Sequence, residues 1–125
     1  MDDETHGCDA LLAEIDAFYQ GFGHSAALTS AFRDAVVLVP LTDDERIPTS
    51  AVVGIDWVCA FTSEYEYARY LVARGEGSEV RKYHAVLGRR IVDDLIPTLQ
   101  APTGVVVDPC GAAPMAFPPA AEDVA

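Results

Sequence analysis

The fold is decided by residues 51–66, whose sequence is AVVGIDWVCAFTSEYE. Larger and smaller side chains alternate up to Phe61, a period of two that is typical of a β-strand or a pair of strands. Gly54 marks a bend or bulge within it. The larger residues, which we expect to face the core, are Val53, Ile55, Trp57, Cys59 and Phe61. Ser63, followed three residues later by Glu66, is a capping box and predicts that a helix begins there.

Further helices and strands are predicted on both sides of this stretch. Apolar residues recur at spacings of three and four after Asp9, which is suited to cap a helix that ends near Gly21. We expect that helix to bury Leu11, Leu12, Ile15, Phe18, Tyr19 and Phe22. The other predicted helices cover residues 25–33, 63–74 and 89–100, the last ending early at Pro97. The other predicted strands cover residues 36–39, 83–87 and 104–107.

This order of elements predicts an α/β (α+β) fold. We expect a single domain over residues 9–111, with a mixed sheet of about four to five strands packed with helices. Residues 1–8 are expected to be a disordered acidic N-terminus. Residues 112–125 are rich in Pro and Ala and are expected to be an irregular tail, pinned to the body by Met115 and Phe117.

Charge and the distribution of apolar residues argue against a nucleic-acid partner and a membrane partner. The chain of 125 residues has 8 Lys and Arg against 20 Asp and Glu, a net charge of −12. Because binding to nucleic acid needs clustered basic side chains, we expect no nucleic-acid partner. No apolar run approaches the roughly 20 residues that span a bilayer, so we expect no membrane partner. The acidic N-terminus is unlike a signal peptide, which favours the cytoplasm.

Cysteines and metal-ligating residues do not form a recognisable motif. The three cysteines are an odd number and include no Cys-x-x-Cys pair, which argues against a disulfide framework. The histidines His6, His24 and His84 lie far apart in the sequence. Asp43, Asp44 and Glu45 lack the alternation of a calcium loop. We therefore expect no metal and no cofactor.

Three short motifs resemble the N-terminal domain of the SseB-like family. They are a strand that ends in Pro, Val37-Leu38-Val39-Pro40; a strand that enters a helix, Phe61-Thr62-Ser63-Glu64; and a final strand, Gly104-Val105-Val106-Val107-Asp108-Pro109. The resemblance covers roughly residues 24–111, and the sequence departs from it at Cys110, which separates Pro109 from Gly111. It implies a small bacterial α/β domain without an agreed catalytic activity.

The candidate binding residues lie where two of the predicted strands end. Helical spacing predicts that Tyr67 and Tyr70 face the core, and it leaves Tyr65 outside that face. We expect it to help line a recognition surface near Asp108. The full set of candidate binding residues is Trp57, Phe61, Tyr65, Asp108 and Cys110.

We therefore predict a non-catalytic, cytoplasmic protein-binding or adaptor module, with a protein partner and no catalytic residues. The excess negative charge at the two ends is expected to serve solubility, and a second possibility is that the acidic N-terminal segment docks on a basic partner. The alternative is a small-ligand-binding protein or a small thiol-dependent enzyme that uses Cys110 as nucleophile and His84 as base. A homodimer formed by pairing of sheet edges is compatible with either hypothesis.

Overall fold

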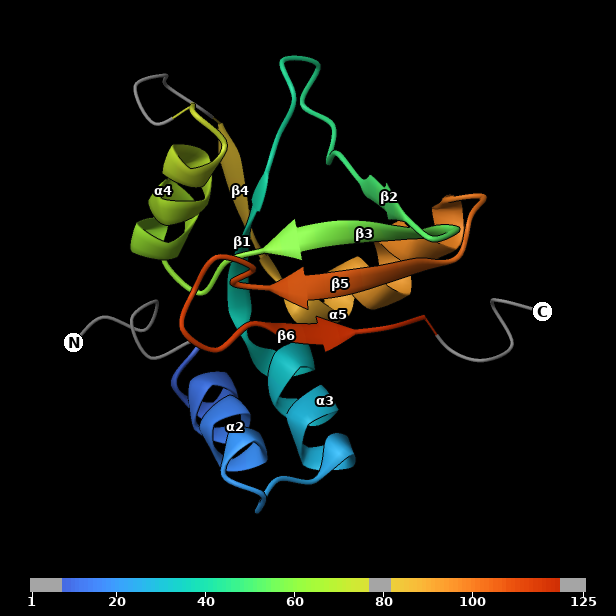
Figure 1. Ribbon diagram of the computed structural model, residues 1–125. Coiled ribbons are helices and arrows are strands. Elements are labelled where there is room, and N and C mark those ends of the chain that lie inside the picture. The colour runs from blue at the N-terminus through green and yellow to red at the C-terminus, as the bar shows by residue number, and fades with distance from the viewer. Residues whose placement is uncertain (1–7, 77–81, 120–125) are drawn as a thin grey trace.

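The computed structural model describes residues 8–76 and 82–119 (Figure 1). Its helical elements are α2 (Asp9–Tyr19), α3 (Ser25–Asp34), α4 (Glu64–Ala73), α5 (Gly88–Arg90), the π-helical turn η1 (Ile91–Leu95) and the 3-10 turn η2 (Ile96–Thr98). Its strands are β1 (Val36–Pro40), β2 (Ser50–Val52), β3 (Ile55–Ala60), β4 (Tyr83–Leu87), β5 (Thr103–Val107) and β6 (Met115–Phe117).

The described strands form two sheets that meet at one point. One sheet is the antiparallel pair β1–β4, and the other has the order β2-β3-β5-β6, with β3 parallel to β5 and the other neighbours antiparallel. Leu38 and Phe61 join the sheets by exchanging two backbone hydrogen bonds of 2.8 Å. The mixed α+β single domain is thus confirmed, although the six strands of the described residues lie in two sheets rather than one.

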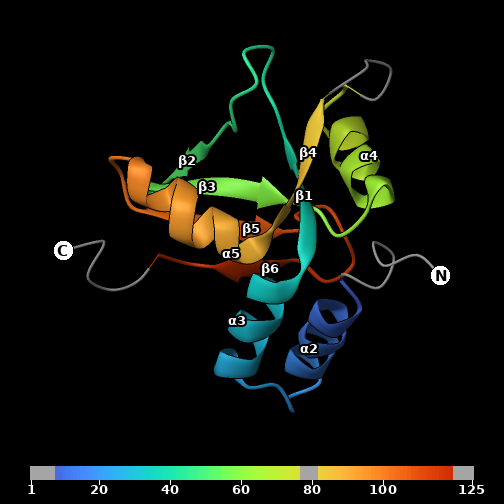
Figure 2. The ribbon, with the colours of Figure 1, turned by 180° about the vertical axis from the view of Figure 1, so that it is seen from behind.

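Helices cover the four-stranded sheet on the face that forms the core. Figure 2, the view from behind, shows α5 and the turns that follow it in front of this sheet, with α2 and α3 together below β6. One continuous core includes Leu11, Ile15, Leu28, Phe32, Val37, Val39, Val58, Ala60, Ile91, Val105, Val107 and Met115. Because this core draws on both sheets and on the helices, the described chain packs as one unit.

The buried face of β3 is the opposite of the one that the alternation predicts. Val58 and Ala60 are fully buried, whereas Trp57 is only half-buried. The reason is the neighbouring strand: Val58 pairs with Val105 and Ala60 with Val107, and this row of small residues faces the helices. Side-chain size alone therefore pointed to the wrong face of β3, although Phe61, just after the strand, is fully buried as predicted.

Of two predicted helices, α4 forms as expected, whereas the other is irregular. In α4 the backbone N–H of Glu66 donates to the Ser63 hydroxyl at 3.2 Å, so the capping box is confirmed. The helix predicted over residues 89–100 is irregular, because it passes from α5 through the π turn η1 into η2. It ends near Pro97, as predicted.

The first helix buries fewer residues than expected. Leu11 and Ile15 are buried, but Leu12, Phe18, Tyr19 and Phe22 are exposed. The helix also begins without a side-chain cap, since Cys8 occupies the N-cap position and Asp9 is the first helical residue. Of the described helices, α3 packs most closely on α2, and this contact covers one side of it.

Both ends of the chain carry more structure than predicted. Cys8, expected to belong to a disordered terminus, is buried, and its thiol donates to the Val36 carbonyl at 2.9 Å. Residues 115–117, expected to be an irregular tail, form β6 and pair with β5, which confirms only that Met115 and Phe117 contact the body. The expectations for residues 1–7 and 120–125 lie outside the described residues.

Candidate functional site

The five candidate binding residues do not form one exposed surface. Phe61 has no exposed area, and its ring lies 5.1 Å from the rings of both Tyr67 and Tyr70, measured between centroids. A side chain that is fully covered cannot contact a partner without unfolding of its surroundings. Phe61 is therefore not part of an exposed surface, its ring packs β3 against α4, and its role in binding stays a prediction.

Trp57 contacts its own sheet. It lies opposite Gly104 on β5, and a Cβ atom added at Gly104 would approach the indole ring to 2.6 Å. The indole therefore covers the strand at the position where a glycine leaves room for it. This packing accounts for the half-buried state of Trp57 without a ligand.

Tyr65 is the candidate that is presented to solvent. It lies in the first turn of α4 and is exposed, with the Arg69 guanidinium 5.7 Å from its ring centroid. This is an ordinary cation–π contact on a helix surface. It holds the ring in place and leaves the ring accessible.

Asp108 connects the end of β5 to the beginning of α4. Its side chain accepts hydrogen bonds from the Thr62 backbone N–H at 2.9 Å and from the Thr62 hydroxyl at 2.7 Å. Burial raises the pKa of this carboxyl group, and the two bonds from Thr62 oppose that shift. Asp108 is only 6% exposed, so its carboxylate is not presented at the surface, and its role in binding stays a prediction.

The structure does not bring together the pair proposed for thiol catalysis. His84 is exposed on β4 beside Tyr83, whose ring packs at 5.8 Å against Tyr67 of α4. Because neighbouring residues of a strand point to opposite faces, His84 points away from α4. Cys110 follows β5 of the four-stranded sheet, whereas β4 pairs with β1 in the other sheet.

Two of the three free thiols are held in their protonated form. Burial, reinforced by the charges of Asp108 and Asp9, raises the pKa of Cys8 to about 11. Burial also raises the pKa of Cys59, while the Tyr70 hydrogen bond and Arg74 act in the opposite direction. A raised pKa lowers the thiolate fraction, and the thiolate is the nucleophile.

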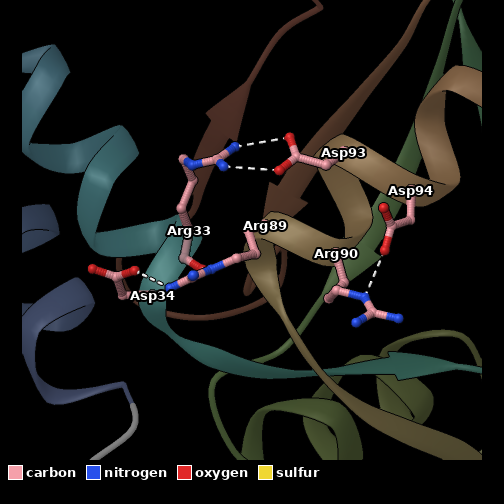
Figure 3. Close-up of polar contacts among 6 residues, drawn as sticks. All are labelled: Arg33, Asp34, Arg89, Arg90, Asp93 and Asp94. Atoms are coloured by element: carbon pink, nitrogen blue, oxygen red, sulfur yellow. Dashed lines mark hydrogen bonds and ion pairs between the residues drawn. The ribbon is translucent and has the colours of Figure 1, made fainter.

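Three ion pairs neutralise the densest group of arginines. Figure 3 shows Arg33 bound to Asp93 through two bonds of 2.8 and 3.0 Å, together with the pairs Arg89–Asp34 and Arg90–Asp94. The pairs Arg33–Asp93 and Arg89–Asp34 join α3 to α5 and η1 on the surface. Because each guanidinium faces a carboxylate, this group offers little net attraction to a phosphate or another anion.

One surface that the sequence analysis placed in the core is the exposed side of the first helix. We call the four residues Leu12, Phe18, Tyr19 and Phe22 the α2 surface. Leu12 and Tyr19 lie seven residues apart on a side of the helix different from that of Leu11 and Ile15, whereas Phe18 and Phe22 follow Leu11 and Ile15 by seven residues, the spacing of a shared side. The offset of Leu12 and Tyr19 is a signal for a second apolar side, but no local spacing indicates that Phe18 and Phe22 are exposed.

A large hollow between helices and sheet was also missed. We call it the α3 hollow; it measures about 660 Å³ and lies between α3, residues 92–102 and the strands β5 and β6. Representative side chains on its walls are Leu28, Phe32, Ile96 and Phe117, with Phe18 at its edge. No local pattern predicts it, because its walls come from four separate segments of the chain.

A second, smaller hollow of about 250 Å³ lies between the loop after β1 and α4. Cys59, Tyr70 and Arg74 contribute to its wall. The Arg74 guanidinium lies 5.3 Å from the Tyr70 ring centroid and is also bound to Glu76 at 3.1 Å. Its cation is thus already paired with a carboxylate.

Comparisons with known proteins leave the family open. No protein-family model matches the chain, and searches of curated proteins and of solved structures find no match either. The resemblance to the SseB-like family therefore stays a prediction that rests on three short motifs. Within residues 8–76 and 82–119, no group of three or more His, Cys, Asp and Glu side chains is arranged to hold a metal ion. None of the described helices combines the length and apolar character needed to cross a bilayer.

Proposed function

We propose that the protein is a non-catalytic module of the bacterial cytoplasm that binds a protein partner through the α2 surface. The observation that carries the proposal is the exposure of four large apolar side chains on and just after one helix. Phe22 is 75% exposed and Leu12 is 44% exposed. Grouped apolar side chains on a protein surface commonly mark a site of interaction.

The α2 surface is held in place before any partner binds. Leu11 and Ile15 anchor the inner side of α2 in the core. The Tyr19 hydroxyl donates to the Pro114 carbonyl, which ties the end of the helix to the segment before β6. A preorganised surface loses less conformational entropy on binding than a flexible one.

Charge indicates the chemistry of the partner. Asp9, Glu14 and Asp16 lie on the same helix, and no Lys or Arg occurs from Cys8 to Phe32. The complementary partner is a protein segment that carries apolar side chains together with Lys or Arg. A second copy of the chain is a poor match, since each copy carries a net charge of −12 and like charges repel.

The experiment is a comparison of three tagged proteins purified at low salt from the organism that encodes the chain. They are the natural protein, a double variant Leu12→Ser with Phe22→Ser, and a control variant Val72→Ser. Val72 is exposed on α4 and lies outside the α2 surface, so the control makes the same kind of change elsewhere. All the replaced side chains are exposed, and we expect each variant to fold.

We expect one partner that co-purifies with the natural protein and with Val72→Ser and is lost from the double variant. High salt should also release it, because screening weakens attraction between exposed charges. A carbodiimide that joins carboxylates to amines should link Glu14 or Asp16 to a lysine of that partner. Recovery of the same partner at equal yield with the double variant would refute the proposal, as would recovery of none at low salt.

A further inference from the structure

The α3 hollow is a gap in the core that opens to solvent. Leu28, Phe32, Val105 and Met115 line it and are also members of the buried core cluster. Protein interiors are normally filled to the density of organic crystals. A volume of about 660 Å³ beside the core is within the range of sites that hold small molecules.

The walls of the hollow are uncharged. Within the described part of the chain, no Asp, Glu, Lys, Arg or His contributes to the lining. The neighbouring Arg33 and Asp93 bind each other instead. A charged ligand would lose its hydration here without gaining a counter-charge, which is strongly unfavourable. The hollow also has a few polar side chains, among them Ser25, Thr29 and Gln100. These side chains can orient a ligand by binding one neutral polar group on it.

An irregular helix forms one wall. The turn η1 is π-helical over Ile91–Leu95 and passes into the 3-10 turn η2. Val92 and Ile96, from these two turns, both line the hollow. Single π turns are rare and occur frequently at functional sites, so this wall is a second observation that indicates a ligand.

Two macromolecular occupants fit poorly. An extended peptide would add to the free edge of β6, but Pro118 and Pro119 follow that strand directly and have no N–H group to donate. A second copy of the chain is opposed by the repulsion between two net charges of −12. A small molecule needs neither a strand edge nor charge complementarity.

We propose that the α3 hollow, between α3, residues 92–102 and β5–β6, is a binding site for an uncharged, largely apolar small molecule. This inference does not rest on the proposed function, because Leu12 and Phe22, the residues changed in that test, do not line the hollow. The two sites share Phe18, which lines the hollow and is exposed on α2.

The test uses Nile red, an uncharged apolar dye, with the full-length protein and two tryptophan variants. Thr29→Trp places a large side chain in the hollow, whereas Ser30→Trp places the same side chain one residue further along α3, outside the lining. Both positions are exposed, so both variants should keep the fold, which thermal unfolding checks. The anionic dye 8-anilinonaphthalene-1-sulfonate tests the preference for an uncharged ligand.

We expect saturable binding of one Nile red molecule to the natural protein and to Ser30→Trp. Thr29→Trp should bind at least tenfold more weakly. The anionic dye should bind the natural protein more weakly than Nile red does. The proposal is overturned if the natural protein shows no saturable binding, if Thr29→Trp binds as tightly as Ser30→Trp, or if the anionic dye is preferred. Loss of a protein partner from Thr29→Trp with unchanged Nile red binding would assign the hollow to that partner instead.

Discussion

The Asp108 carboxylate binds both polar groups that Thr62 presents to it, the backbone N–H at 2.9 Å and the hydroxyl at 2.7 Å. Thr62 immediately precedes Ser63, the N-cap of α4. One buried side chain therefore fixes the end of β5 relative to the start of α4. Asp108 also adopts a positive φ of 49°, a conformation that Asn and Asp tolerate better than most residues.

Replacement of Asp108 should give opposite results for alanine and asparagine. Asp108→Ala removes both acceptors, leaves the Thr62 N–H unpaired and places Ala at a positive φ. We expect it to lower the free energy of unfolding by about 1–3 kcal/mol. Asp108→Asn keeps an acceptor for the Thr62 N–H and carries no charge, so it should be as stable as the natural protein at pH 7 or more stable. Urea unfolding of the three proteins measures both effects, and a loss in Asp108→Asn as large as that in Asp108→Ala would contradict this account.

The pH dependence of that comparison has a definite sign. Burial raises the pKa of Asp108 in the folded protein above its ordinary value. The folded state therefore binds more protons than the unfolded state between these two pKa values, and Asp108 lowers stability as the pH rises through this window. The stability of the natural protein relative to Asp108→Asn should fall as the pH rises from about 3 through the window and then become constant. A relative stability that rises with pH would show that the Thr62 bonds outweigh burial.

Gly88 is required by a close approach of the backbone. A Cβ atom at this position would lie 2.0 Å from the Phe32 carbonyl oxygen, and the Gly88 N–H donates to the Ala35 carbonyl at 2.9 Å. Gly88→Ala must therefore push β4 and α5 away from the end of α3, and we expect it to lower the free energy of unfolding by about 3 kcal/mol. Gly21→Ala is the control, because no atom lies within 4 Å of its added Cβ and only its positive φ opposes the change. Equal losses of stability in the two variants would exclude the close approach as the cause.

The type of each main element could be predicted from local pattern, and so could the buried face of α3, but the buried face of β3 could not. The spacing of apolar residues and the capping box at Ser63 depend on neighbours in the sequence, and the predicted helices and strands formed near those residues. Which side of β3 faces the core depends on β5, since Val58 is buried beside Val105. The strand β6 has only three residues and forms because β5 offers it a free edge.

The candidate site was predicted less well for the same reason. Asp108 lies at the end of a strand, as predicted. A position at a strand end does not determine exposure, and the Asp108 carboxylate is buried and hydrogen-bonded to Thr62. Tyr65 is exposed because the other tyrosines of its helix satisfy the packing with Phe61. The α2 surface and the α3 hollow arise from how separate segments pack, and no single segment encodes them.

The turn between β2 and β3 holds a residue in an unfavourable conformation. Val53 has a φ of 50° and is followed by Gly54 with a φ of 80°, and its side chain is 97% exposed. Two-residue hairpin turns with positive φ at both positions favour Asn-Gly, and a β-branched residue is strained there. Val53→Asn should raise the free energy of unfolding by about 1 kcal/mol, as measured by urea unfolding. A loss of stability would show that the Val53 side chain makes a contact worth more than the strain.

Thiol labelling should distinguish Cys8 from an ordinary surface cysteine. Its pKa of about 11 leaves very little thiolate at pH 7.5, and its Sγ is buried and bound to the Val36 carbonyl. We expect iodoacetamide to modify Cys8 in the folded protein more than a hundredfold more slowly than in urea, since modification requires local opening of the N-terminal part of the fold. Mass spectrometry of digested samples follows each cysteine separately. The variant Asp108→Ala lacks the carboxylate charge that helps to raise the pKa of Cys8. The rate of Cys8 labelling in this variant is therefore a second measurement. Labelling of Cys8 in the folded protein at the rate seen in urea would mean that the residue is not enclosed by the core.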